Sequence, residues 1–178
     1  YEFITDWSTL PENPEQEALN PDTYPSNAYV GDGNWSNEIY GGDIEGIISK
    51  IEYLKALGVN VIYLNPIFSS ISSHRYDTSD YTKIDPILGT LGDFSELVAV
   101  CEQNDMHVVL DGVFNHCGSF NKWLDRERIY ENQEGYDKGA YIEEESPYHS
   151  FFRYREKAWP YNEKYDGWWG HDTLPKLN

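Results

Sequence analysis

Apolar positions along the chain recur with two different periods. Between residues 44 and 57, and again between 94 and 101, they recur at the spacing of an amphipathic helix. Each predicted helix is followed by a short, almost continuously apolar run, at residues 59–64 and 107–111, as is typical of buried parallel strands. A similar short run at residues 1–5 is expected to be the first strand. The predicted order is therefore β-loop-α-β-loop-α-β.

The ends of the helices carry their own signals. Asp43 is placed to cap the first helix, and Gly58 is placed to end it. The second helix is expected to begin at a capping box formed by Asp93 and Glu96. Residues 8–42 and 67–91 contain many turn-forming residues and no period, so both are predicted to be long loops.

Strands that alternate with amphipathic helices pair in parallel through crossover connections, which predicts an α/β fold. The carboxyl ends of such strands meet at one edge, where α/β barrels and open α/β sheets both build their sites. Two long loops at that edge favour a barrel, and no glycine-rich phosphate-binding fingerprint follows any strand. A short helix is expected at residues 119–131. Residues 131–178 have little period and are interpreted as an irregular excursion after the third strand.

Composition and net charge exclude some classes of partner and favour others. The 178 residues carry a formal net charge of −18, which argues against nucleic acid as a partner, because phosphates are bound by Lys and Arg. Aromatic residues make up 16% of the chain; their faces suit sugar rings, and ordinary core packing is the alternative. No apolar run is long enough to cross a membrane. Cys101 and Cys117 are expected to be buried free thiols, with a disulfide as the alternative.

Four motifs, in order along the chain, resemble the α-amylase family of glycoside hydrolases. Asp111-Gly-Val-Phe-Asn115-His116 resembles the Asp-x-x-x-Asn-His signature of its third barrel strand, and residues 58–66 resemble its second strand. Residues 74–81 resemble its His-x-Tyr-Asp-x-x-Asp-Tyr loop. Residues 174–178, Leu-Pro-Lys-Leu-Asn, are similar to a motif of the neopullulanase, cyclomaltodextrinase and amylopullulanase branch.

The resemblance implies a partial (β/α)8 TIM barrel. Residues 1–116 would supply its strands one to three with two helices, and residues 117–178 would form an inserted domain. Retaining glycosidases use two carboxyl groups about 5 Å apart, and in this family they follow strands four and five. A complete barrel also takes roughly 200 residues or more. We therefore expect a fragment with no catalytic residue of its own, inactive without the remainder of the same barrel.

The implied activity is retaining hydrolysis of α-1,4 bonds, and of α-1,6 bonds as a further option, in starch, pullulan or cyclodextrins. The alternative is a noncatalytic glucan-binding module or a degenerate barrel protein that lacks the carboxylates. The resemblance is also compatible with two locations. A secreted or cell-surface protein is expected, with the cytoplasm as the alternative.

The resemblance assigns substrate-binding residues as well. Tyr76 would stack on the sugar beside the scissile bond and favour positive charge at its anomeric carbon. Asp77 and His116 would hydrogen-bond hydroxyls of that sugar. Trp168 and Trp169 would stack on more distant glucose units. Packing is the alternative role for each ring, and capping a turn is the alternative for Asp77.

Three further residues would support the site. Asp111 is expected to orient an arginine of the fourth barrel strand through a charge-assisted bond. In many α-amylases the residue at the position of Asn115 binds calcium together with an Asp, but that Asp is replaced here by Lys176. An ammonium group cannot ligate a cation. We therefore expect no calcium at Asn115, and expect Lys176 to hydrogen-bond Asn115 or a nearby carbonyl.

Calcium at the first long loop is the remaining cofactor prediction. Relatives in this branch bind calcium with a stretch like Gly41-Gly42-Asp43, and oxygen ligands suit calcium. Their Asn-Gly-Asp-rich partner stretch is missing here, because residues 10–17 read Leu-Pro-Glu-Asn-Pro-Glu-Gln-Glu. The predicted metal residues are therefore Gly41 and Asp43, and the alternative is that Asp43 only caps its helix.

Overall fold

The structure is a computed structural model that describes residues 42–156 and 160–178. The chain divides into two compact units. The first runs to Arg75 and continues over Tyr81–Asp111, whereas the second contains Tyr76–Asp80 and Gly112–Asn178. The predicted strand at residues 1–5 and the loop at 8–41 lie outside the described residues.

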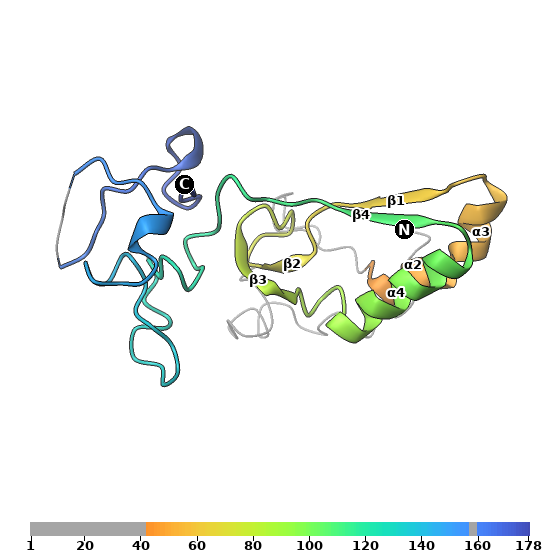
Figure 1. Cartoon of the computed structure of the whole chain (residues 1–178), viewed down its shortest axis with the longest axis horizontal. Helices are drawn as coiled ribbons and strands as arrows, with labels where there is room; N and C mark the ends of the chain where they lie inside the picture. Colours follow the sequence, from red (N-terminus) through yellow and green to blue (C-terminus); the bar gives the residue numbers. More distant parts are fainter. Residues whose placement is uncertain (1–41, 157–159) are drawn as a thin grey trace, which may run out of the picture. The chain divides into compact units, whose positions relative to one another are not determined.

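The first unit is built on two parallel strands, β1 (Val61–Leu64) and β4 (His107–Leu110), which lie side by side in Figure 1. Val61 pairs with His107 and Leu64 with Leu110. Within the described residues three helices accompany them, and α2 and α4 pack on one another. They are α2 (Ile44–Ser49), α3 (Ile51–Ala56) and α4 (Leu91–Gln103). The predicted parallel pairing of the two strands is confirmed.

The helix predicted over residues 44–57 is two helices. Asp43 caps α2 as predicted, because its Oδ1 accepts a hydrogen bond of 2.6 Å from the backbone nitrogen of Gly46. Lys50 leaves helical geometry with φ −108° and ψ 5°, so α3 begins a new helix after it. Gly58 has φ +83° and follows the end of α3, as the sequence predicted.

The start of α4 differs from the prediction. Thr90, and not Asp93, is the N-cap, and the two residues form the capping box together. Oδ2 of Asp93 accepts a hydrogen bond of 2.6 Å from the backbone nitrogen of Thr90. Glu96 is exposed and takes no part in this cap. The prediction placed the cap three residues late because Asp is itself a good N-cap residue.

Residues 67–91 are not a single loop, and that prediction is wrong. They contain β2 (Phe68–Ser70) and β3 (Thr78–Ile84), which pair with each other. The rings of Phe68 and Tyr81 contact each other across this pair, with centroids 6.1 Å apart. The Ser and Asp residues of this region are turn formers, and β3 has no regular alternation of apolar and polar residues that would have indicated a strand.

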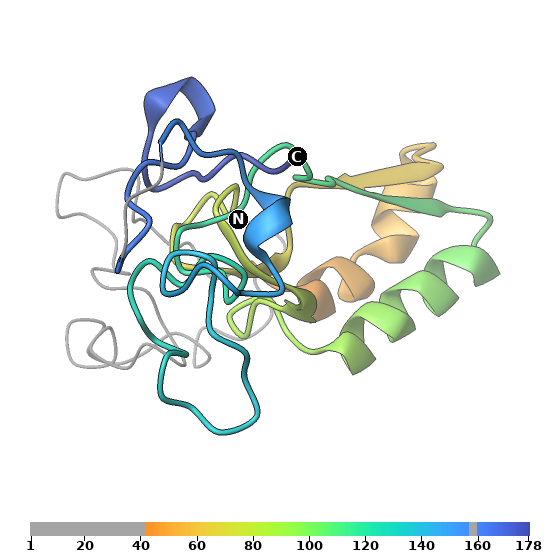
Figure 2. The ribbon, with the colours of Figure 1, turned by 60° about the vertical axis from the view of Figure 1, so that its left-hand side comes forward.

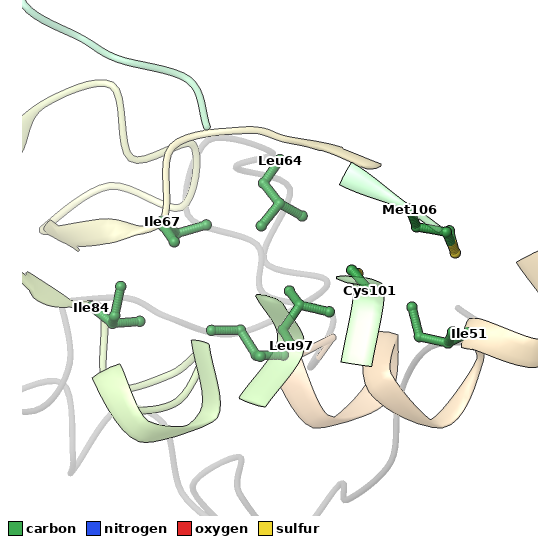
Figure 3. Packing of buried hydrophobic residues seen from close by; sticks show 8 residues of the cluster. Ile51, Leu64, Ile67, Ile84, Leu97, Cys101 and Met106 are labelled. Atoms are coloured by element: carbon green, nitrogen blue, oxygen red, sulfur yellow. The ribbon is translucent and has the colours of Figure 1, made fainter. Parts of the chain in front are cut away.

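The core of the first unit lies between the strands and the helices (Figure 3). Leu97 and Cys101 of α4 are 0% and 1% exposed and sit at its centre. Both cysteines are buried free thiols, as predicted. The other face of the strand pair is open, because Val61, Tyr63 and Val109 are 46%, 59% and 42% exposed. Parallel strands are usually covered on both faces.

The second unit has little regular structure, as predicted for residues 131–178 (Figure 2). Its only described helices are two short 3-10 turns, η3 (His149–Phe151) and η4 (Trp168–Gly170). The helix predicted at residues 119–131 is absent, and turns stand there instead. The carboxylate of Asp125 accepts the backbone N–H of Ile129 at 2.7 Å, which is the local competition that keeps such residues out of helices. No helix in the described part of the chain is both long and apolar enough to cross a membrane.

Candidate functional site

The C-terminal segment of the chain forms the middle of a small backbone ladder in the second unit. The backbone nitrogen of Leu177 donates to the carbonyl of Asn115 at 3.0 Å, and that of Cys117 donates to the carbonyl of Pro175 at 3.1 Å. On the other side, Gly167 and Pro175 form an antiparallel bridge. The ladder brings together two of the motifs found in the sequence and holds the start of η4 beside them.

A third motif is attached to the same place through its backbone. The carbonyl of Thr78 accepts hydrogen bonds from the backbone nitrogen of Gly118 at 2.9 Å and from the side chain of Asn121 at 3.3 Å. A Cβ atom on Gly118 would lie 2.5 Å from the carbonyl oxygen of Asp77. Only glycine allows this approach. Gly118 lies two residues after the motif that ends at His116, and the sequence did not indicate this contact.

His116 is the centre of these contacts and is 5% exposed. Its Nε2 lies 3.0 Å from the carbonyl oxygen of Tyr76, and its Nδ1 lies 3.1 Å from the amide nitrogen of Asn115. A carbonyl only accepts, so Nε2 carries the proton and Nδ1 accepts from Asn115. Burial lowers the pKa of His116, although the Tyr76 carbonyl and the charge of Asp77 oppose this shift. The ring is therefore neutral around pH 7.

Three aromatic rings stack outward from this point. The ring of His116 stacks on Trp168 with centroids 4.9 Å apart, and Trp168 stacks on Trp169 at 4.3 Å. Trp169 is 82% exposed and has φ +51°, which is unusual for a bulky residue. Tyr76 is 39% exposed, whereas Asp77 is buried. All five predicted substrate-binding residues thus belong to the second unit.

Asn115 and Lys176 are neighbours through the backbone. Lys176 forms an antiparallel bridge with His116 and is exposed. The amide nitrogen of Asn115 donates to Nδ1 of His116, whereas a bond from Lys176 would go to the amide oxygen of Asn115 or to a nearby carbonyl, so the bond expected from Lys176 stays a prediction. The sugar-binding role predicted for His116 remains a prediction, and it requires that one of the two ring bonds be exchanged for a hydroxyl.

Asp111 belongs to the first unit. Its backbone nitrogen donates to the carbonyl of Leu64 at 3.1 Å, which continues the pairing of β4 with β1. A hydrogen bond with the Asp111 carboxylate is the main cause that raises the pKa of the exposed Tyr63 phenol. The predicted bond to an arginine of a fourth strand stays a prediction.

The metal prediction rests on Asp43 alone within the described residues, because Gly41 lies outside them. Oδ1 of Asp43 already accepts the cap bond from Gly46. Across residues 42–156 and 160–178, no three or more His, Cys, Asp or Glu side chains form a group that could hold a metal ion. The calcium prediction at Gly41 and Asp43 therefore stays a prediction.

Comparison with known proteins decides the family. The sequence profile described as "Alpha amylase, catalytic domain" matches residues 20–178. The chain belongs to the α-amylase catalytic-domain family. All four motifs that resembled this family fall within the matched range, and three of them meet at His116 in the second unit.

Relatives of this α-amylase family chain include several enzymes named for pullulan. An amylopullulanase of Thermoanaerobacterium saccharolyticum is 42% identical over 99% of the chain and 13% of its own length. A type III pullulan hydrolase from Thermococcus kodakarensis is 40% identical, with a TM-score of 0.64 over 80% of the chain and 23% of that protein. The chain spans between 9% and 13% of the length of three amylopullulanases.

A further solved structure includes a bound sugar. It is the cyclic α-maltosyl-(1→6)-maltose hydrolase from Arthrobacter globiformis in complex with maltose. This enzyme is 34% identical to the α-amylase family chain, with a TM-score of 0.68 over 98% of the chain and 35% of that protein. The fold of the chain is thus shared with enzymes that are named for α-linked glucans.

Proposed function

We propose that the protein to which this chain belongs is a retaining glycoside hydrolase that cleaves α-glucosidic bonds in starch, pullulan or cyclodextrins. The observation that carries the proposal is the match of residues 20–178 to the α-amylase catalytic domain. Relatives named amylopullulanase, cyclomaltodextrinase and neopullulanase support this substrate class. The proposal covers α-1,4 bonds, and α-1,6 bonds as a second specificity.

The proposed architecture is a (β/α)8 barrel whose second and third strands are β1 and β4. The open face of this strand pair supports it, since Val61, Tyr63 and Val109 would face the interior of the barrel and be covered there. Residues 1–116 would belong to the barrel and residues 117–178 to an inserted domain. The nucleophile and the acid/base are expected after strands four and five. We therefore expect the 178-residue chain to be inactive by itself.

The substrate roles follow from exposure and from the hydrogen bonds of the second unit. Nε2 of His116 donates a hydrogen bond to the carbonyl of Tyr76 and so holds its backbone, and the half-exposed ring of Tyr76 would stack on the sugar at the cleaved bond. Trp169 and the edge of Trp168 would hold a more distant glucose unit. Asp77 is buried, and its charge acts on His116, so the two residues would bind hydroxyls of the same sugar.

The test is hydrolysis by the full-length protein. Soluble starch, pullulan and β-cyclodextrin are offered separately, and the reducing ends and product sizes are measured. Proton NMR during the first turnovers identifies the anomer that is released first, and retention predicts the α-anomer. Binding of all three glucans without cleavage would instead favour a noncatalytic or degenerate barrel protein. The isolated chain, assayed beside the full-length protein, is expected to release no sugar.

Calcium and location are separate proposals. We expect that, if calcium binds, Gly41 and Asp43 provide oxygen ligands together with residues outside the described part of the chain. Thermal unfolding of the full-length protein in calcium and in EDTA tests this, and equal midpoints would contradict it. A secreted or cell-surface location is proposed, and fractionation of the cells that produce the protein tests it.

A further inference from the structure

We propose that Asn115 is a positioning residue, whose side-chain amide holds the His116 ring as the Nε2–H tautomer and thereby fixes the site rings that His116 contacts. The inference rests on the proposed glucan hydrolysis, because the effect of a substitution at Asn115 is measured partly as enzyme activity. It differs from the metal-linked role that the family resemblance suggests for Asn115. It also gives His116 a structural task that is distinct from binding sugar.

The two bonds to His116 admit only one neutral tautomer. The Tyr76 carbonyl, 3.0 Å from Nε2, can only accept, so Nε2 must donate. Nδ1 then carries a lone pair and accepts a hydrogen bond from the amide nitrogen of Asn115, which lies 3.1 Å away. In the other tautomer, a lone pair would face the carbonyl and two N–H groups would face each other. Each of these leaves a polar group of the site without its hydrogen bond, which disfavours that tautomer.

The fixed ring of His116 in turn positions two aromatic residues of the site. Its Nε2–H bond fixes the backbone of Tyr76, and its ring face stacks on Trp168. If the imidazole of His116 flipped by half a turn, its hydrogen bond to the Tyr76 carbonyl would be lost. If the ring tilted, its stacking on Trp168 would be lost. Asn115 therefore acts through His116 on two of the three residues whose rings are proposed to hold sugar, Tyr76 and Trp168.

The groups around His116 determine how a substitution of Asn115 would change the protonation of the ring. The charge of Asp77 acts on the ring and favours the protonated form, whereas burial opposes it. Trp168 offers an uncharged ring face, and Lys176 meets His116 through its backbone, with an exposed side chain. An Asn115→Asp change would place an acceptor at Nδ1. It would favour the imidazolium, which donates from both nitrogens.

The experiment compares full-length wild type, Asn115→Asp and Asn115→Ala, with Asn104→Asp as the matched control. Asn104 also donates a hydrogen bond from its side-chain amide, to the backbone carbonyl of Val100 at 2.9 Å, but it lies at the end of α4 in the first unit and makes no hydrogen bond to a histidine of the described residues. The readouts are kcat and KM on pullulan and starch from pH 5 to 8, and 15N spectra of histidine-labelled protein. A His116→Gln sample assigns the His116 signals.

We expect the His116 signals of wild type to show a protonated Nε2 and an unprotonated Nδ1 at pH 7. Asn115→Asp should move the acidic limb of the kcat/KM profile upward by about one pH unit or more. Asn115→Ala should lower kcat/KM about tenfold without moving that limb. Asn104→Asp should match wild type in both spectra and profile.

Two results would overturn the inference. One is an Nδ1–H signal for His116 in wild type, and the other is a pH profile of Asn115→Asp that coincides with that of wild type. A purely structural role would lower the yield of folded protein and leave the tautomer and the profile as they were. If wild type cleaves none of the glucans, the proposed function fails, while the 15N spectra still decide the tautomer.

Discussion

The imidazole of His116 lies nearly parallel to the indole of Trp168, with their centroids 4.9 Å apart and their planes 17° from parallel. Trp168 in turn lies 12° from parallel with Trp169. The stack therefore begins at a buried ring with two hydrogen bonds and ends at a ring that is 82% exposed. An exposed indole held flat in this way offers a sugar an apolar face at little further cost in side-chain entropy.

The first prediction follows from this exposed ring. Trp169→Ala in the full-length protein should raise KM for pullulan and starch about three- to tenfold, because a stacked aromatic contact contributes about 0.5–1.5 kcal/mol. The value of kcat should change little if Trp169 lies away from the cleaved bond. Steady-state kinetics on long and short maltooligosaccharides measures both values.

Tyr53→Ala is the control, because Tyr53 is another exposed ring, 49% accessible, on α3 of the first unit. It should leave KM unchanged. Trp169→Phe, which retains a flat face, should recover part of the affinity. A KM for Trp169→Ala equal to that of wild type on every glucan would mean that the ring does not bind sugar.

The second prediction concerns the close approach at Gly118. An added Cβ would lie 2.5 Å from the carbonyl oxygen of Asp77, and backbone atoms cannot yield as a flexible side chain can. Gly118→Ala should therefore destabilise the protein by roughly 1–3 kcal/mol. It should also lower kcat/KM, because the displaced segment includes Tyr76. Gly42→Ala is the control, since nothing lies within 4 Å of a Cβ there. Equal melting temperatures for the two variants would contradict this account.

The sequence predicted elements whose signals are local. Asp43, Gly58 and the apolar runs of β1 and β4 each act through their own neighbours, and all were found where expected. The helix break at Lys50 was missed because the apolar period continues through it without interruption. The turns at residues 119–131 were missed because the Asp125 side chain caps backbone groups there, and periodicity does not record that bond.

The candidate site was predicted by motif and not by geometry. Tyr76, His116 and Trp168 lie far apart in the sequence, and only the resemblance to a family placed them together. What no pattern could supply is the bonding of individual atoms. The amide nitrogen of Asn115 donates to Nδ1 of His116, which neither the motif nor its spacing could indicate. The proposed tautomer comes from that bond together with the bond that Nε2 donates to the Tyr76 carbonyl.

The third prediction tests the capping box of α4. Thr90→Ala removes the hydroxyl that accepts the backbone N–H of Asp93 at 3.3 Å, and leaves the Asp93 carboxylate with one donor fewer. The expected cost is about 1 kcal/mol. Thr90→Ser keeps the hydroxyl and should cost much less. Thermal unfolding of the full-length variants gives the comparison, and identical midpoints for Ala and Ser would show that this cap does not stabilise α4.

The last prediction concerns Glu127, a carboxylate that the sequence did not single out. Its Oε1 accepts a hydrogen bond of 2.7 Å from the hydroxyl of Ser119, whereas its Oε2 is buried and makes no hydrogen bond. Burial is the main cause that raises the pKa of Glu127 above its usual value, although the Ser119 bond and Arg126 oppose this. The ionised form is thus disfavoured in the folded protein.

The sign of the pH dependence follows from this shift. A carboxyl group whose pKa is higher in the folded than in the unfolded state stabilises the fold, and this contribution is fully present when the pH is below the unfolded-state pKa. It is lost as the pH rises through the folded-state pKa. Glu127→Gln keeps the acceptor for Ser119 and removes the charge. At pH 7 it should raise the melting temperature by about 2 °C, and the difference should shrink as the pH falls towards 4. Glu134→Gln removes an exposed charge and should shift the melting temperature little at either pH. A Glu127→Gln variant that is less stable than wild type at pH 7 would show that the negative charge stabilises the fold, through Arg126.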